Sequence, residues 1–190
     1  NGGPFTAAAY DGDEEAALKV RQAFLKLIPR QEIVDKLVKP LNPEAEIRNS
    51  FTAVPGSPMY AGITAGNGMD AYDVLDVEGA KELIAEAGVE TPIDVRLMFA
   101  AGNERRANEY ALMNEVMTDS GLFNLIDSSH ADWGSMLSDS ALYDASMFGW
   151  ASSSTAVTSH QRNFGTDGQN NFGGYSNAEV DGWFEGVQSD

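Results

Sequence analysis

The side chains best suited to bind a ligand lie between residues 147 and 177, where an apolar, aromatic start gives way to a long polar run. Trp150 closes the apolar part, and the hydroxyls of Ser152 to Ser154 follow it. An aromatic ring beside hydroxyl and amide groups suits a polar solute that is uncharged or zwitterionic. A loop of this length is usually functional or disordered. The alternative is a loose surface loop with Trp150 in the core.

Catalytic and metal-binding patterns are weaker. His160 could form a hydrolytic site with Ser135 or Ser154 and an Asp, but no G-x-S-x-G turn accompanies it. His130 and His160 each stand without a second ligand at metal-binding spacing, so exposed histidines are the simpler interpretation. The chain has no cysteine and no phosphate-binding glycine loop. We therefore expect no catalytic residue, no metal and no cofactor.

The charge excludes some partners. Against 12 basic residues stand 29 acidic ones, which gives a net charge of −17 and a pI near 4.3. Such a surface repels nucleic acid, and it repels an anionic bilayer unless an anchor outside this sequence holds it there. No apolar run reaches the roughly 18 residues that a membrane span needs. The first residue is not Met, and we expect a fragment of a longer protein.

Periodicity in the sequence predicts an α/β fold. Residues 11–38 read as two helices in series, divided at Pro29, and apolar spacing predicts further long helices over residues 76–87 and 104–119. Residues 93–99 alternate between apolar and polar side chains, as a strand does. Shorter strands are expected near residues 122–129 and 142–150, with a short helix between them and a last helix after Ser176.

Several finer features are also predicted. Residues 39–75 hold four prolines and read as an irregular segment, with one short strand around Ile47. Capping-box spacings place N-caps at Asp11 and Ser176, and Asp76 is the N-cap expected for the helix that follows it. Gly88 and Gly121 are placed to end their helices. The arginines at positions 105 and 106 are expected to be solvated.

Four segments together resemble one family. They are "ALKVRQAFLKLIPRQEIVDKLV", "DVEGAKELIAEAGV", "YDASMFGW" and "GGYSNAEVDGWF". In this order they resemble the V-R-x-A, D-x-x-x-A-K-x-L-x-x-A-G, Y-D-x-x-x-x-G-W and G-Y-x-N-x-x-V-D motifs of extracytoplasmic solute-binding proteins of the oligopeptide/dipeptide type (family 5). The four motifs occur in the family's order and together span nearly the whole chain, so the resemblance is specific.

The resemblance implies a periplasmic binding protein-like type II lobe, with a mixed sheet flanked by helices. Residues 1–190 would form this one lobe, the later lobe of a longer two-lobed protein. It implies capture of a peptide or another polar small solute outside the membrane, and delivery to the transmembrane subunits of an ABC permease. An extracytoplasmic place follows, either periplasmic or on the cell surface through a lipid anchor. The ligand contacts that we then expect are Trp150, Ala151, Ser152, Ser153, Ser154, Asn170, Asn171 and Phe172.

One position departs from the family pattern. Peptide-binding members carry an Asp three residues after the Trp of the G-W pair, and it holds the amino terminus of the peptide. Ser153 stands there in this chain. A hydroxyl does not neutralise a buried ammonium as a carboxylate does. Blocked peptides, oligosaccharides and other polar solutes therefore become alternatives to free peptides, while a Ser/His hydrolase and a sensor module stay open as other classes of function.

Overall fold

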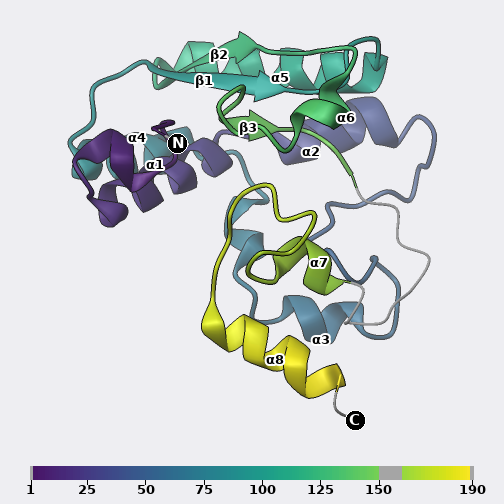
Figure 1. Cartoon of the computed structure of the whole chain (residues 1–190). Coiled ribbons are helices and arrows are strands. Elements are labelled where there is room, and N and C mark those ends of the chain that lie inside the picture. The colour runs from purple at the N-terminus through teal and green to yellow at the C-terminus, as the bar shows by residue number, and fades with distance from the viewer. Residues whose placement is uncertain (1, 150–159, 189–190) are drawn as a thin grey trace.

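The computed structural model describes residues 2–149 and 160–188 (Figure 1). Trp150 to Ser154, five of the predicted ligand contacts, lie outside the described residues. Helical elements come first, and strands and helices then alternate from residue 93 to residue 146, as the sequence predicts. In chain order they are η1 (Ala7–Tyr10), α1 (Glu14–Lys26), α2 (Arg30–Ile33), η2 (Val34–Val38), α3 (Tyr60–Thr64), η3 (Met69–Tyr72), α4 (Val77–Ala87), β1 (Ile93–Met98), α5 (Glu104–Ser120), β2 (Phe123–Asp127), α6 (Trp133–Met136), β3 (Ala145–Ser146), α7 (Gln161–Phe164) and α8 (Ala178–Gln188).

The sheet has β1 at its centre, with β2 on one side and β3 on the other. Both pairings are parallel: Val95 is opposite Leu125, and Leu97 is opposite Ala145. The α/β fold with flanking helices is therefore confirmed, and all three described strands run in one direction. Because they are parallel, their carboxyl ends meet at one edge of the sheet.

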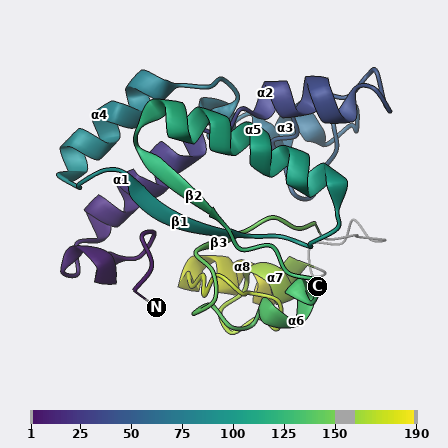
Figure 2. The ribbon, with the colours of Figure 1, turned by 90° about the horizontal axis from the view of Figure 1, so that it is seen from above.

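The apolar residues of β1 and β2 pack against α1, α4 and α5, which lie around the two strands (Figure 2). Phe24 of α1 meets Phe123 of β2 edge to face, with ring centroids 5.4 Å apart. The buried members of this core are Val20, Ala23, Phe24, Leu27, Ala80, Ile84, Ile93, Val95, Leu97, Met113, Met117, Leu122, Phe123 and Leu125. The helical spacing on α1, α4 and α5 identified their inward faces correctly.

Helix ends agree with the sequence in most places. Asp76 caps α4 by accepting a hydrogen bond from the Gly79 N–H at 2.9 Å. Gly88 and Gly121 end α4 and α5 with φ of 66° and 71°, in the left-handed region that favours glycine. The cap predicted at Asp11 is wrong. Asp13 caps α1 instead, accepting from the Ala16 N–H at 3.0 Å.

Residues 39–75 are largely irregular, but they contain the short helices α3 and η3. The strand predicted around Ile47 does not form. Hydrogen bonds hold this segment: Asp73 accepts from the Arg30 guanidinium at 2.9 Å and from the Asn49 amide at 2.9 and 3.0 Å. Asn49 is almost fully buried, and its Nδ2 is paired with Asp73, whereas its Oδ1 is buried without a hydrogen-bond partner among the described residues.

The last described part, residues 160–188, contains α7 and α8, which lie beside each other (Figure 1). The predicted N-cap at Ser176 is wrong. Its hydroxyl bonds the Thr166 hydroxyl, and Asn177 caps α8 by accepting from the Glu179 and Val180 N–H groups. Among the helices of residues 2–149 and 160–188, none combines the length and apolarity that crossing a membrane requires.

Candidate ligand-binding site

The three strand ends are tied together beyond the sheet. Ala100, after β1, forms a parallel bridge with His130, after β2, and the Ala101 N–H donates to the His130 carbonyl at 3.0 Å. On the other side of β1, the Met147 N–H donates to the Met98 carbonyl at 2.8 Å. This carboxyl edge is where open α/β sheets bind their ligands. It carries the candidate site.

Three aromatic rings stand in a row beside this edge. Trp133 of α6 lies 6.1 Å from Phe148, the second residue after β3, and Phe148 lies 6.3 Å from Phe172. We call Trp133, Phe148 and Phe172 the aromatic row. Phe172 is one of the predicted ligand contacts that the structure describes. Its ring lies beside that of Phe148, just after the end of β3. Ring faces and edges of this kind can pack against a solute.

The two predicted asparagines make contacts within the loop. Asn171 donates its amide to the carbonyls of Gly165 and Tyr175, at 3.0 and 2.6 Å, and its Oδ1 accepts from the Tyr175 N–H. The Asn170 amide donates to Asn163 Oδ1 at 3.0 Å. These bonds fix the backbone that carries Phe172. A role for Asn170 and Asn171 as direct ligand contacts stays a prediction.

Arg106, at the start of α5, is the residue that the sequence interpretation misjudged. Its side chain is 18% exposed, whereas that of Arg105 is 56% exposed. Arg106 Nη1 donates to Glu109 Oε2 at 2.6 Å, and Arg106 Nη2 lies 3.8 Å from the position of a Cβ on Gly149. The expectation of solvation is correct for Arg105 and wrong for Arg106. A glutamate three residues after the arginine was the available sequence signal.

Both histidines make local contacts with residues close to them in the sequence. His130 is exposed, and its Nδ1 accepts from the Asp132 N–H at 3.0 Å. The Ser135 hydroxyl donates to the Asp132 carbonyl at 2.8 Å rather than to a histidine. His160 lies beside Phe164, with ring centroids 6.3 Å apart. Within the described ranges, no cluster of three or more Asp, Glu or His side chains could hold a metal ion.

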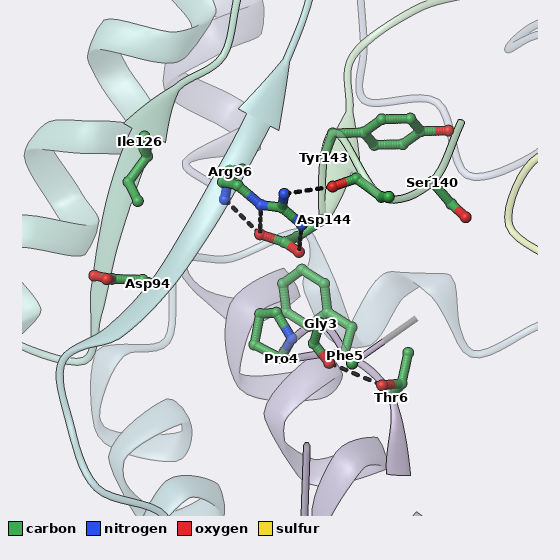
Figure 3. A pocket seen from close by; sticks show the side chains of 12 residues that line it. Gly3, Pro4, Phe5, Thr6, Asp94, Arg96, Ile126, Ser140, Tyr143 and Asp144 are labelled. Carbon is green, nitrogen blue, oxygen red and sulfur yellow. Dashed lines mark hydrogen bonds and ion pairs between the residues drawn. The ribbon is translucent and has the colours of Figure 1, made fainter. Parts of the chain in front are cut away.

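A cavity of about 650 Å³ lies between the N-terminal segment and the strands (Figure 3). Figure 3 shows Arg96 of β1 reaching Asp144, the residue just before β3. Asp144 accepts from the Arg96 N–H at 2.8 Å, from Nε at 3.0 Å and from Nη2 at 2.7 Å. The bond to Asp144 raises the pKa of the Arg96 guanidinium. The pair therefore anchors the start of β3 and, through it, the carboxyl edge.

All three guanidinium nitrogens of Arg96 are hydrogen-bonded in this cavity, because Nη1 also donates to the Ala141 carbonyl at 2.6 Å. Burial raises the pKa of the Tyr143 hydroxyl, and that hydroxyl donates to the Leu137 carbonyl at 2.6 Å. The polar groups that line the cavity are thus largely satisfied by the protein itself. We assign this region a positioning role and place the candidate site at the carboxyl edge.

The parallel sheet flanked by helices is an α/β fold that the chain shares with periplasmic-binding-protein-like structures. Residues 13–172 match the bacterial extracellular solute-binding proteins, family 5, middle region. The chain belongs to this family. The match runs across the sheet and reaches Phe172.

Solved structures show the same fold. The chain is similar to NikA from Staphylococcus aureus in complex with Ni(L-His)2, with 19% identity and a TM-score of 0.64 over 88% of this chain and 34% of that one. It is similar to the periplasmic EDTA-binding protein EppA, with 19% identity and a TM-score of 0.73 over 88% of this chain and 33% of that one. A putative peptide-binding protein, AppA from Clostridium difficile, gives 22% identity and a TM-score of 0.67 over 88% of this chain and 33% of that one.

This chain thus spans about a third of the length of those proteins. A search of curated proteins found no match. The shared fold extends through most of the chain and leaves the ligand to be inferred from the site.

Proposed function

We propose that residues 1–190 form one lobe of a longer, two-lobed receptor that captures a polar solute outside the membrane and delivers it to an ABC permease. The observation that carries this proposal is the joining of three parallel strand ends beside the aromatic row. Family membership supports an extracellular role. The match covers only about a third of each of those structures, which supports a second lobe.

The solute would bind at the carboxyl edge, between this lobe and the other. Trp150 to Ser154 would contact it from the segment that follows β3, and Phe172 would contact it from the neighbouring loop. Closure of two lobes over a ligand excludes water and strengthens hydrogen bonds to it. Such binding needs no reacting group, so we propose a receptor and not an enzyme.

Peptides and related polar solutes are the ligand classes that we favour. The names of the similar structures cover a nickel–histidine complex, EDTA and a putative peptide ligand, so the shared fold is compatible with several chemistries. Ser153 favours a solute without a free amino terminus, because its neutral hydroxyl does not neutralise a buried ammonium group. Oligosaccharides and metal chelates are therefore the alternatives to peptides.

A thermal-shift screen of this chain and of the full-length protein tests the proposal. A ligand that binds the folded state raises the unfolding temperature by mass action. We expect one class among peptides, oligosaccharides and metal chelates to stabilise the full-length protein more than the lobe, because the lobe offers half of the enclosing surface. Phe172→Ala should reduce the shift. Trp183→Ala is the matched control, since Trp183 is 61% exposed on α8.

Two results would contradict the proposal. One is an absence of any shift with all three ligand classes. The other is hydrolysis of an ester or a peptide, measured by chromatography of the products, with the activity lost in His160→Ala. If Phe172→Ala and Trp183→Ala reduce the ligand-induced rise in unfolding temperature equally, the ligand does not bind at the aromatic row.

A further inference from the structure

His130 joins the chain that follows β1 and β2 to the start of α6. Its N–H donates to the Phe99 carbonyl at 3.1 Å, and its carbonyl accepts from the Ala101 N–H at 3.0 Å. The same carbonyl accepts from the Trp133 N–H at 3.3 Å. Backbone bonds of this kind need no particular side chain. They bring the residue at position 130 to the carboxyl edge and leave its side chain to be explained.

The imidazole of His130 adds a bond that depends on its protonation state. Its Nδ1 accepts a hydrogen bond from the N–H of Asp132, the residue before α6, at 3.0 Å. A neutral imidazole has one acceptor nitrogen, whereas an imidazolium donates from both nitrogens. Protonation of His130 therefore removes the acceptor and sets an imidazolium N–H against the Asp132 N–H.

The turn that this bond holds carries the ring of Trp133. Trp133 is the first residue of α6, and its ring lies 6.1 Å from that of Phe148 in the aromatic row. Helix α6 has four residues, and the side chain of its N-cap, Asp132, makes no capping bond. A helix of one turn gains little stability from its own hydrogen bonds. The position of Trp133 therefore depends on the bonds that hold the chain just before it.

The elements around His130 carry mainly acidic side chains. Asp127 ends β2 and Asp132 precedes α6, while Glu104 and Arg105 begin α5, which follows the loop bonded to the His130 backbone. Of these four charges, three are negative. An imidazolium at position 130 is attracted by carboxylates and repelled by the Asp132 N–H, so both forces draw the charged ring away from the turn.

We propose that His130 is a positioning residue of the ligand site, whose neutral imidazole holds the start of α6 and whose protonation releases Trp133 from the aromatic row. The inference rests on the proposed function, because it gives the aromatic row of that site a pH-dependent assembly. Histidine changes its charge between about pH 5 and 8. The bond from Asp132 is present at the upper end of this range and is lost as the pH falls.

Nuclear magnetic resonance of the isotope-labelled chain, titrated between about pH 8 and 5, tests the inference without a ligand. We expect the Asp132 N–H and the Trp133 indole N–H signals to move with the same midpoint as the His130 ring signals. An ordinary hydrogen bond shifts an equilibrium by about fivefold. The nuclear Overhauser effect between the Trp133 and Phe148 rings should therefore fall by about half or more at the acidic end.

His130→Asn is the variant that separates protonation from structure. The amide of asparagine places an acceptor oxygen at about the position of Nδ1, and it does not titrate. We expect this variant to keep the Overhauser effect between Trp133 and Phe148 at both ends of the pH range. His130→Ala, which lacks the acceptor, should show the weak effect at both ends.

His160→Asn is the matched control, because the chain has only two histidines. His160 lies beside Phe164, with ring centroids 6.3 Å apart. Its replacement should leave the movement of the Asp132 and Trp133 signals unchanged. Loss of that movement in His160→Asn would assign the titration to the wrong histidine and overturn the inference.

Three further results would overturn it. The Asp132 N–H could stay fixed while the His130 ring titrates, or the signals could move equally in His130→Asn, which would point to a carboxylate. The Trp133–Phe148 effect could also persist in acid, which would show that other contacts hold the ring. Each result leaves the receptor function in place, since no ligand is used. Failure of the thermal-shift screen, in contrast, removes the receptor function and leaves the pH-dependent position of Trp133 standing.

Discussion

Residues 14–127 and residues 160–188 are stabilised by different forces. The first region buries aliphatic and aromatic side chains between its helices and strands, and Phe123 and Val95 are among the residues almost without exposure. In the second region, Phe184 and Gly165 are the buried residues among those described. Its loop depends on amide and hydroxyl contacts, such as those of Asn171 and Thr166.

This difference separates a scaffold from a loop that carries proposed ligand contacts. Apolar packing is non-directional and large in sum, so it fixes the sheet and the position of its carboxyl edge. Hydrogen bonds between loop atoms contribute less to stability, but they fix directions. The described part of the polar run that begins after β3 follows the second pattern, and it carries Phe172 to the strand ends.

The largest expected effect comes from the scaffold. Phe123→Ala removes a ring that is 1% exposed and packs against Phe24, so we expect a loss of about 3–5 kcal/mol in the free energy of unfolding. Urea unfolding measures it. Trp183→Ala, on the exposed side of α8, should change that free energy by less than about 0.5 kcal/mol. Similar losses in the two variants would remove the distinction between the regions.

The second effect concerns the connection between scaffold and site. Asp144→Asn removes the charge that Arg96 contacts through three groups, and the Asp144 side chain is 5% exposed. We expect a loss of about 2 kcal/mol in unfolding free energy. Hydrogen exchange at the Met147 N–H should also become faster, because this group is bonded to β1 just after β3.

Asp94→Asn is the control for that experiment. Asp94 lies on the same strand and is exposed, and it accepts a hydrogen bond from Asn124 at 2.8 Å. Its replacement should leave Met147 exchange unchanged. An effect as large as that of Asp144→Asn would show that charge in general, and not the Arg96 contact, holds β3 in place.

A smaller effect is expected in the loop that contains Asn171. Asn171→Ala deletes the bonds to Gly165 and Tyr175, so local opening of the loop should become easier by about 1–2 kcal/mol. Hydrogen exchange at the Tyr175 N–H reports this opening. The midpoint of urea unfolding should hardly move. A large shift of the midpoint would mean that the loop and the scaffold unfold as one unit.

The smallest effect is a pH dependence. Hydrogen bonds from Lys26 and from the Gly79 N–H lower the pKa of Asp76. A carboxyl whose pKa is lower in the folded state stabilises the protein above its unfolded-state pKa of about 3.9, and that contribution disappears as the pH falls through the folded-state pKa. We therefore expect Asp76→Asn to destabilise the protein at neutral pH and to match the parent in strong acid. A difference that grows on acidification would contradict this sign.

Periodicity in the sequence was sufficient to predict the helices and strands of the scaffold. The inward faces of α1, α4 and α5 and the alternation in β1 are local patterns, and they set the fold class. Caps were harder, because neighbouring residues compete: Asp13 replaces Asp11, and Asn177 replaces Ser176. Both alternatives are good caps, so only the backbone geometry decides between them.

The site depended on contacts that no local pattern reveals. The Arg106 side chain is 18% exposed and lies near Gly149, more than 40 residues later in the sequence. The short helix α7 lies within residues 147–177, which were interpreted as a continuous loop. Phe172 was predicted as a ligand contact, but its ring partner Phe148 was not singled out. Long-range packing, rather than propensity, determines these features.

The brevity of β3 has an evolutionary consequence. It pairs with β1 only at Ala145 and Ser146, and the Ser146 hydroxyl donates to the Met98 carbonyl at 3.0 Å. Met147 still packs against the core, but the residues after it lie outside the core formed by β1 and β2, so insertions, deletions and substitutions there leave its buried residues in place. Natural selection can therefore change the chain that follows Met147 while the sheet is inherited unaltered.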